Sequence, residues 1–85
     1  MRSIHDKRYR RIIAFIVGHR EEAGITQVQL SKMLHLRQEI ISKIENCDRR
    51  IDILELIDYC SHVGISISDV VALLDRNSIT TQHLR

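Results

Sequence analysis

The chain has 85 residues, enough for one small domain with its own core, and its 44% apolar and 28% charged residues are an ordinary globular balance. No apolar run reaches the roughly 18 residues of a transmembrane helix, so we expect no membrane partner. The net charge of +2 conceals an asymmetry, because residues 1–50 carry eleven Lys and Arg against six Asp and Glu, whereas residues 51–85 carry two against five. A basic half indicates a polyanionic partner such as nucleic acid, although an unevenly charged solvated surface would give the same count.

Apolar residues recur at helical spacing from about residue 5 to residue 23 and predict a first helix. Gly24 then favours a left-handed stop, after which Ile25 can fold back onto the last turn. Thr26, with Gln29 three residues later, has the spacing of a capping box and opens a second helix at about residues 27–34. Its inward-facing residues are expected to be Val28, Leu30 and Leu34.

A third helix is predicted from residue 37 or 38 to residue 45. Asp52 with Glu55 resembles another cap and opens a fourth helix to about residue 63, which Gly64 ends. The apolar face of this fourth helix is expected to hold Ile53, Leu56, Ile57 and Cys60. Ser66 can cap a short fifth helix at about residues 67–74.

No segment alternates with the two-residue period of a strand. We therefore predict an all-α fold, a compact bundle of about five short helices, in a single domain over residues 1–75. Residues 76–85 show little periodicity and are predicted to form a flexible C-terminal tail.

The predicted third helix has one apolar face and one face of polar groups. Ile41 and Ile44 share the apolar face, with Ile40 at its flank. The polar stripe consists of Gln38, Glu39, Ser42, Lys43 and Asn46. Amide, carboxylate and ammonium groups of this kind read base edges in the major groove, since Gln pairs with adenine, Glu accepts from cytosine and Lys donates to guanine. Any exposed helix face is polar, however, so the stripe by itself does not establish DNA binding.

The order of the motifs is more specific. The chain carries R-x-x-x-G-x-T-Q-x-x-L at Arg20–Leu30, I-S-K-I-E-N at Ile41–Asn46 and V-G-I-S ending at Ser66. Together these resemble the phage-repressor (lambda-repressor-like, XRE) helix-turn-helix family over about two thirds of the chain. The resemblance implies a transcriptional regulator, acting as a repressor, that binds a near-palindromic operator in double-stranded DNA as a homodimer. The two cysteines, Cys47 and Cys60, do not make a disulfide framework, so we expect the protein to be cytoplasmic.

The resemblance also implies roles for single residues. The helix at about 38–45 becomes the recognition helix, and the expected base contacts are Gln38, Glu39, Lys43 and Arg37. Gln27 matches the position that grips a phosphate at the start of the second helix, where a backbone N–H suits an anion. The expected phosphate contacts are Gln27, Ser42, Asn46 and Arg49. Arg20 and Glu45 match an internal ion pair, and Arg20 falls on the inner face of its helix.

Two positions depart from the family pattern, which usually has glycine where this chain has His35 and Cys47. Both follow a predicted helix end, where a left-handed conformation is common. A side chain there costs about 1 kcal/mol. Either the backbone avoids positive φ at these positions or the protein tolerates the strain.

The sequence contains no catalytic motif: it has neither a glycine-rich phosphate loop nor a nucleophile elbow. Its five histidines lack metal-ligand spacing, so we expect no enzyme activity, no cofactor and no metal.

Apolar residues in the first and fifth helices exceed what so small a domain can bury. We expect a homodimer to cover them through Val70, Val71 and Leu74, with part of the first helix or the tail. The alternative function is an antitoxin or another protein-interaction module whose main partner is a protein such as a toxin.

Overall fold

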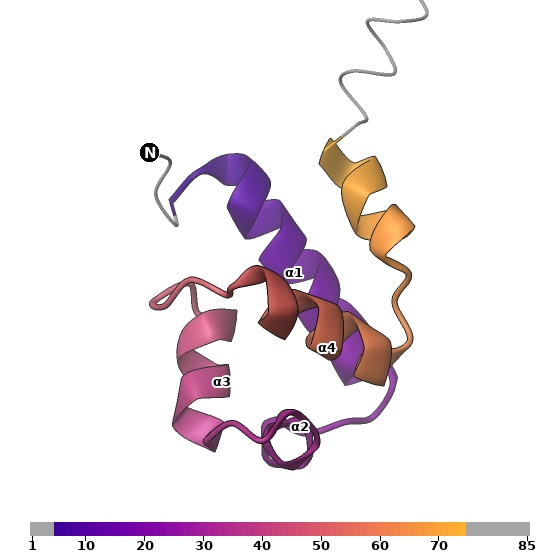
Figure 1. The fold of residues 1–85 in the computed structure, drawn as a ribbon. Helices are drawn as coiled ribbons and strands as arrows, with labels where there is room; N and C mark the ends of the chain where they lie inside the picture. The colour runs from indigo at the N-terminus through magenta and orange to yellow at the C-terminus, as the bar shows by residue number, and fades with distance from the viewer. Residues whose placement is uncertain (1–4, 75–85) are drawn as a thin grey trace, which may run out of the picture.

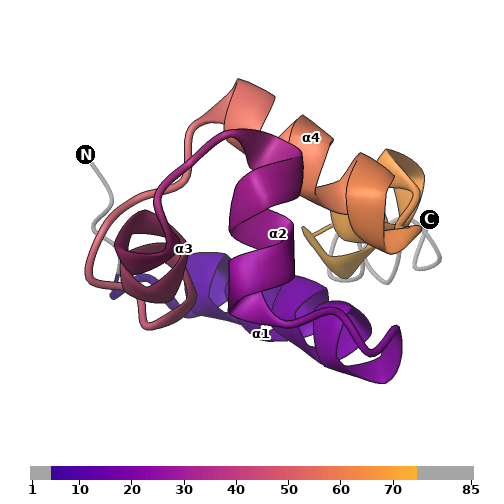
Figure 2. The same ribbon diagram turned by 90° about the horizontal axis from the view of Figure 1, so that it is seen from below.

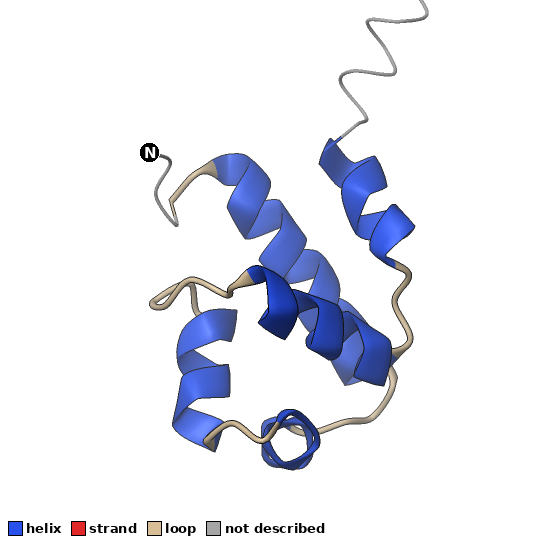
Figure 3. Cartoon of the chain, viewed as in Figure 1, coloured by secondary structure: helices blue, strands red, loops and turns tan. Residues whose placement is uncertain are grey.

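The structure is a computed structural model that describes residues 5–74. Within this range the chain forms five helices and no strand, which confirms the all-α prediction (Figures 1 and 3). The helices are α1 (Lys7–Glu22), α2 (Gln27–Leu34), α3 (Gln38–Glu45), α4 (Ile53–Val63) and a fifth helix, Ile67–Leu74. The predicted tail at 76–85 lies outside the described residues.

The first four helices enclose one core. Both α3 and α4 pack against α1 and α2. In Figure 1, α2 is seen end-on below α3 and α4, whereas α3 is seen from its side, so the axes of α2 and α3 cross. Figure 2, from below, shows α2 lying across α1 with α3 to one side. One flank of α3 therefore rests on the bundle and the opposite flank is free.

Side-chain caps begin α2 and α4 where the sequence predicts them. The Thr26 Oγ accepts from the Gln29 backbone N–H at 3.0 Å, and the Gln29 side chain accepts from the Thr26 N–H at 2.8 Å. Asp52 and Glu55 form the same reciprocal pair at the start of α4. Both capping boxes satisfy backbone donors that a helix leaves without intrahelical acceptors.

Left-handed residues end the helices. Gly24 and Gly64 have φ of 74° and 81°. The N–H of the following residue then reaches back five positions: Ile25 donates to the Arg20 carbonyl at 3.1 Å and Ile65 to the Cys60 carbonyl at 2.8 Å. This closure turns Ile65 into the core, where it is buried.

The buried apolar residues form one cluster shared by all five helices and their connections. Its members are Ile13, Ile16, Leu30, Ile41, Ile44, Cys47, Tyr59, Cys60, Val63, Ile65 and Val70. In residues 5–74 no single helix is long and apolar enough to cross a membrane. The helices α4 and Ile67–Leu74 meet that measure only when taken together, with a bend of 118° between them.

The predicted apolar face of α4 is partly wrong. Ile53 is 67% exposed and Ile57 is 41% exposed, whereas the buried residues are Tyr59, Cys60 and Val63. The neighbours of α4, which are α1 and α2, cover an arc centred on these three residues and leave the flank that carries Ile53 and Ile57 open. Val28 is wrongly predicted for the same reason, since it lies on a flank of α2 and is 48% exposed.

Candidate nucleic-acid interface

The corner between α2 and α3 has only three residues, 35–37. His35 adopts a left-handed conformation with φ of 57°, and the Leu36 N–H then donates to the Ser31 carbonyl at 3.0 Å. Arg37 follows in an extended conformation as the N-cap of α3. These backbone conformations turn the chain sharply within three residues, so that α3 lies across α2. This is the geometry of a helix-turn-helix.

Positive φ occurs at both positions where the sequence lacks the expected glycine. Cys47, after α3, has φ of 60°, and the Asp48 N–H donates to the Lys43 carbonyl at 2.8 Å. The protein therefore tolerates the left-handed conformation at His35 and Cys47. His35 is exposed, whereas Cys47 is 7% exposed and packs in the core as a small apolar side chain.

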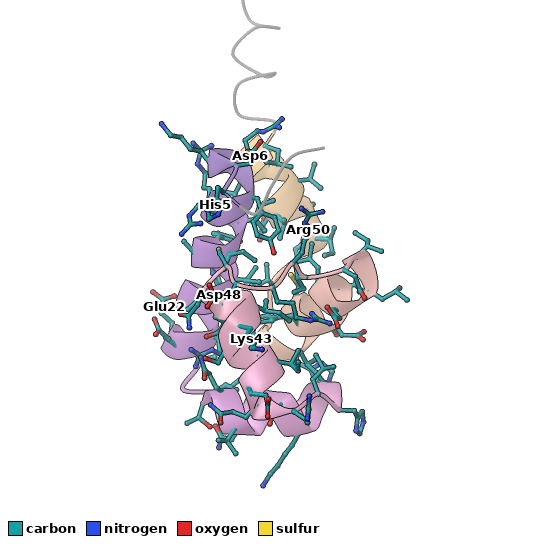
Figure 4. All side chains as sticks on the ribbon, turned by 90° about the vertical axis from the view of Figure 1, so that its left-hand side faces the viewer. His5, Asp6, Glu22, Lys43, Asp48 and Arg50 are labelled. Carbon is teal, nitrogen blue, oxygen red and sulfur yellow. The ribbon has the colours of Figure 1, made fainter. Side chains whose placement is uncertain are left out.

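The outer face of α3 presents the predicted base-reading residues. Gln38, Glu39 and Lys43 are all exposed. Figure 4 views the molecule from this side and shows Lys43 on the near face of α3. Ile41 and Ile44 lie on the opposite face and are almost completely buried. The helix is thus anchored by isoleucines and leaves an amide, a carboxylate and an ammonium group toward solvent.

A buried ion pair anchors the end of α3. The Arg20 guanidinium binds the Glu45 carboxylate with two hydrogen bonds, Nε to Oε2 at 2.7 Å and Nη2 to Oε1 at 2.9 Å. The side chains are only 9% and 5% exposed. Arg20 also donates from Nη1 to the Ile25 carbonyl at 2.6 Å. The expected partners therefore meet, and their fork geometry fixes α3 to the end of α1.

Glu45 accepts from two further side chains. Tyr59 Oη donates to Oε2 at 2.6 Å and Gln27 Nε2 donates to Oε1 at 2.9 Å. Burial by itself would raise the pKa of Glu45, but the hydrogen bonds from Arg20, Tyr59 and Gln27 outweigh it and hold that pKa below its usual value. Burial and the bond to the Glu45 carboxylate raise the pKa of Tyr59 far above its usual value. At neutral pH the carboxylate is ionised and the phenol is protonated.

Gln27 lies at the first position of α2 and links this buried group to the surface. Its side chain donates to Glu45 and accepts from Gln38 Nε2 at 3.0 Å, so it is committed to protein contacts. Its backbone N–H lies in the first turn, where a helix provides no intrahelical acceptor. Of the two groups, the backbone N–H is therefore the one suited to a phosphate.

The remaining predicted contacts lie around α3. Arg37 is exposed at its N-terminus and makes no side-chain cap. Ser42 is half-buried, and Asn46 lies at the C-cap with its amide 3.5 Å from the Ser42 hydroxyl. Arg49 forms two hydrogen bonds to the Glu55 carboxylate, at 2.9 and 3.0 Å. A phosphate at Arg49 would therefore compete with a carboxylate already in place, which weakens the prediction for this residue.

The predicted dimer residues divide between the core and the surface. Val70 is 4% exposed and belongs to the hydrophobic core, so its assignment to an interface is wrong. Ile67, Val71 and Leu74 are 40%, 46% and 41% exposed. They are spaced at i, i+4 and i+7 and form one stripe on their helix, and Val70 lies beside this stripe on the side that is buried in the core.

Tyr59 is the residue of this site that the sequence reasoning missed. It is fully buried and holds Glu45 from the side of α4. Leu56, Tyr59, Cys60 and Val63 have i, i+3, i+4, i+7 spacing, which is a signal as strong as the one that favoured Ile53 and Ile57. Among residues 5–74, no group of three or more His, Cys, Asp or Glu side chains is placed to hold a metal ion.

Comparisons with known proteins agree with this architecture. The HTH_3 helix-turn-helix family model matches residues 19–70, which is more than half of the chain. A solved structure, an XRE-family like protein from Pseudomonas syringae pv. tomato str. DC3000, is 36% identical in sequence, with a TM-score of 0.73 over 92% of each chain. No curated protein matches the chain.

The chain therefore belongs to the XRE-family helix-turn-helix proteins. Proteins of this class are DNA-binding transcription regulators.

Proposed function

We propose that this protein is a repressor that binds a near-palindromic operator as a homodimer, with α3 in the major groove. The observation that carries the proposal is the way α3 is attached to the bundle. Its inner face is held by the buried side chains of Ile41, Ile44 and Glu45. Its outer face leaves Gln38, Glu39 and Lys43 exposed. A rigid helix with exposed hydrogen-bonding groups is what direct readout requires.

The exposed residues divide into two kinds of contact. Gln38, Glu39, Lys43 and Arg37 read bases. The backbone N–H of Gln27, together with Ser42 and Asn46, binds phosphate and fixes the position of α3 on the duplex. Arg49 contributes less than a free arginine because Glu55 offsets its charge. Contacts to phosphate supply affinity without sequence preference, so selectivity is carried by the four base-reading residues.

Dimerisation gives the operator its symmetry. The stripe of Ile67, Val71 and Leu74 is exposed in one protomer, and a two-fold axis beside it would pair this stripe with its own copy. Two recognition helices related in this way read half-sites about one helical turn apart, close to 34 Å centre to centre.

Selection of bound sequences from a random DNA pool tests this function and would give the site, its symmetry and its half-site spacing together. Measurements on the selected site should then separate Glu39→Ala and Lys43→Ala from the control Asp58→Ala, which removes a charge from the exposed side of α4. Each α3 variant should lose about 1–3 kcal/mol of discrimination at one base pair. Glu39→Ala should bind nonspecific DNA at least as well as the unmutated protein, because a carboxylate near phosphates is repelled. An unchanged selected sequence with both α3 variants would show that α3 is not the reading element.

The exposed apolar flank of α4 supports the second candidate, a protein-interaction module such as an antitoxin. Ile53 and Leu54 are 67% and 69% exposed, and Ile57 lies one turn further along. These residues belong neither to the polar face of α3 nor to the stripe on the fifth helix. Leu54→Asp should then abolish capture of a protein partner in an affinity pull-down and leave DNA binding intact. A toxin gene beside the gene for this protein would favour this reading.

A further inference from the structure

The densest group of basic residues lies in a part of the molecule that the proposed function does not use. Four of the first five residues of α1 are lysine or arginine, and the nearest acidic residue is Asp6, directly before the helix. Asp6 pairs with Arg8, whose Nη2 lies 3.0 Å from Oδ2. The other three, Lys7, Arg10 and Arg11, are exposed. Their i, i+3, i+4 spacing places them together on the surface of α1, and we call them the α1 patch.

Tyr9 fixes this end of α1 beside the connection between α3 and α4. Its Oη accepts from the Ile51 backbone N–H at 3.0 Å. Burial raises the pKa of the Tyr9 phenol, and the hydrogen bond to Ile51 and the nearby charges of Arg50 and Arg49 oppose that rise. The phenol is therefore half-buried close to both arginines, and the first turns of α1 are held against the connection.

The α1 patch extends to the face of the molecule that displays α3. Figure 4, which views this face, shows His5 and Arg50 above Lys43. Arg10 Nη1 lies 3.2 Å from His5 Nδ1, so Arg10 reaches the same face. In the connection after α3, Arg50 is accompanied by the exposed Asp48, so the α1 patch supplies the excess of positive charge here.

The position of the α1 patch relative to the dimer axis follows from the fold. In Figure 1 the N-terminal end of α1 and the fifth helix both lie above α3, whereas α2 lies at its lower end. The proposed dimer axis lies beside the stripe on the fifth helix, so this end of each protomer faces the centre of the operator. Since α3 fills the major groove of each half-site in the proposed function, side chains beyond its C-terminal end meet the backbone that borders the groove.

A phosphate backbone is the partner that fits the α1 patch. The patch contains only cationic side chains, and α1 exposes no large apolar side chain that could insert into a lipid layer or a protein groove. Lysine and arginine bind phosphate oxygens through charge-assisted hydrogen bonds. The patch precedes residues 19–70, so it lies outside the part of the chain that the family model matches.

We propose that the α1 patch is a second phosphate-binding surface, which contacts the DNA backbone between the two half-sites. It adds affinity without sequence preference, because phosphates carry no sequence information. This inference rests on the proposed function, since it takes the orientation of the DNA from α3 and the centre of the operator from the dimer.

The test uses operator duplexes in which one segment of the backbone is uncharged. The site selected from the random pool is synthesised with methylphosphonate linkages either between the half-sites or outside them. Binding is measured by fluorescence anisotropy over a range of salt concentrations. A triple variant, Lys7→Gln with Arg10→Gln and Arg11→Gln, removes the charge of the patch and keeps side chains that favour a helix. Lys7→Gln and Lys32→Gln form a matched pair, because both change an exposed lysine on a helix and Lys32 belongs to α2.

On the fully charged operator, the triple variant should bind at least about tenfold more weakly than the unmutated protein. The slope of log affinity against log salt should become shallower by about 0.9 for each phosphate contact that is lost. Lys7→Gln should lose about one such contact, and Lys32→Gln none. Uncharged linkages between the half-sites should weaken the unmutated protein by at least about fivefold more than the triple variant, whereas linkages outside the half-sites should affect the two proteins equally.

Equal weakening of the two proteins by the central linkages, or equal salt slopes for Lys7→Gln and Lys32→Gln, would overturn the inference while the proposed function stands. A triple variant that is monomeric in light scattering would assign the patch to a contact between subunits and would overturn it as well. If the unmutated protein selects no sequence at all, the proposed function fails, and the second phosphate-binding surface fails with it.

Discussion

Replacing Arg20 with alanine should destabilise the fold through a single buried group. The substitution leaves Glu45 ionised, 5% exposed and without its cationic partner. Loss of one partner from a buried ion pair costs about 3–5 kcal/mol. Tyr59 and Gln27 still donate to the carboxylate, which favours the lower part of this range, while the Ile25 carbonyl loses its donor, which adds about 1 kcal/mol. At about 4–8 °C per kcal/mol for a domain of this size, the melting temperature should fall by at least about 12 °C.

The assay is thermal and urea unfolding followed by far-ultraviolet circular dichroism, with Arg11→Ala as the matched control. Arg11 is an exposed arginine on the same helix, so its removal should change stability by no more than about 0.5 kcal/mol. Both variants lose the same charge and the same number of atoms. A difference between them therefore reports on the buried site and not on net charge or helix propensity.

The pH dependence of the difference identifies its cause. In the unmutated protein the pKa of Glu45 is lowered, so its contribution to stability is present above the ordinary value of 4.5 and is lost as the pH falls through the lower folded value. In Arg20→Ala, burial without the arginine should raise the pKa of Glu45, and protonation then relieves the unpaired charge. The gap in unfolding free energy should narrow as the pH falls from 7 toward 3. An Arg20→Ala protein that melts like Arg11→Ala, with altered sequence preference alone, would show that Arg20 contacts DNA instead.

Three further predictions concern the dimer, the left-handed residues and the buried phenol. Val71→Asp should yield monomers in light scattering at tens of micromolar and weaken operator binding more than tenfold. The control Leu54→Asp should remain dimeric. A monomer in the unmutated protein, or monomers only with Leu54→Asp, would contradict the assigned interface. His35→Gly should stabilise the fold by up to about 1 kcal/mol in urea unfolding because it relieves a left-handed side chain in solvent, whereas Cys47→Gly should not, since it also removes a buried side chain; equal effects would refute this account. Because the folded pKa of Tyr59 is raised, stability should be lost as the pH rises above about 10, where an unfolded tyrosine ionises, and Tyr59→Phe should lessen this loss; identical alkaline unfolding of the two proteins would exclude Tyr59 as the cause.

Local signals in the sequence determined the helices and their ends. Thr26 with Gln29, and Asp52 with Glu55, predicted two capping boxes that the structure contains. Such caps depend on groups three residues apart, so they can be read without knowledge of the fold. The order of motifs also indicated the helix-turn-helix family, which the family match confirms.

Only the tertiary structure decided which apolar and polar side chains are covered. From helical spacing, Val70 and Val71 were both predicted to lie in the dimer interface. In the folded protein Val70 is buried in the core, whereas Val71 is exposed. Burial depends on which neighbours lie against each flank of a helix, and periodicity along one helix contains no information about its neighbours. The same holds for the hydrogen bonds from Tyr59 and Gln27 to Glu45, which span 14 and 18 residues of sequence and come from different helices. The sequence supplied these donors and acceptors, but only the packing of α2, α3 and α4 against one another brought them within hydrogen-bonding distance.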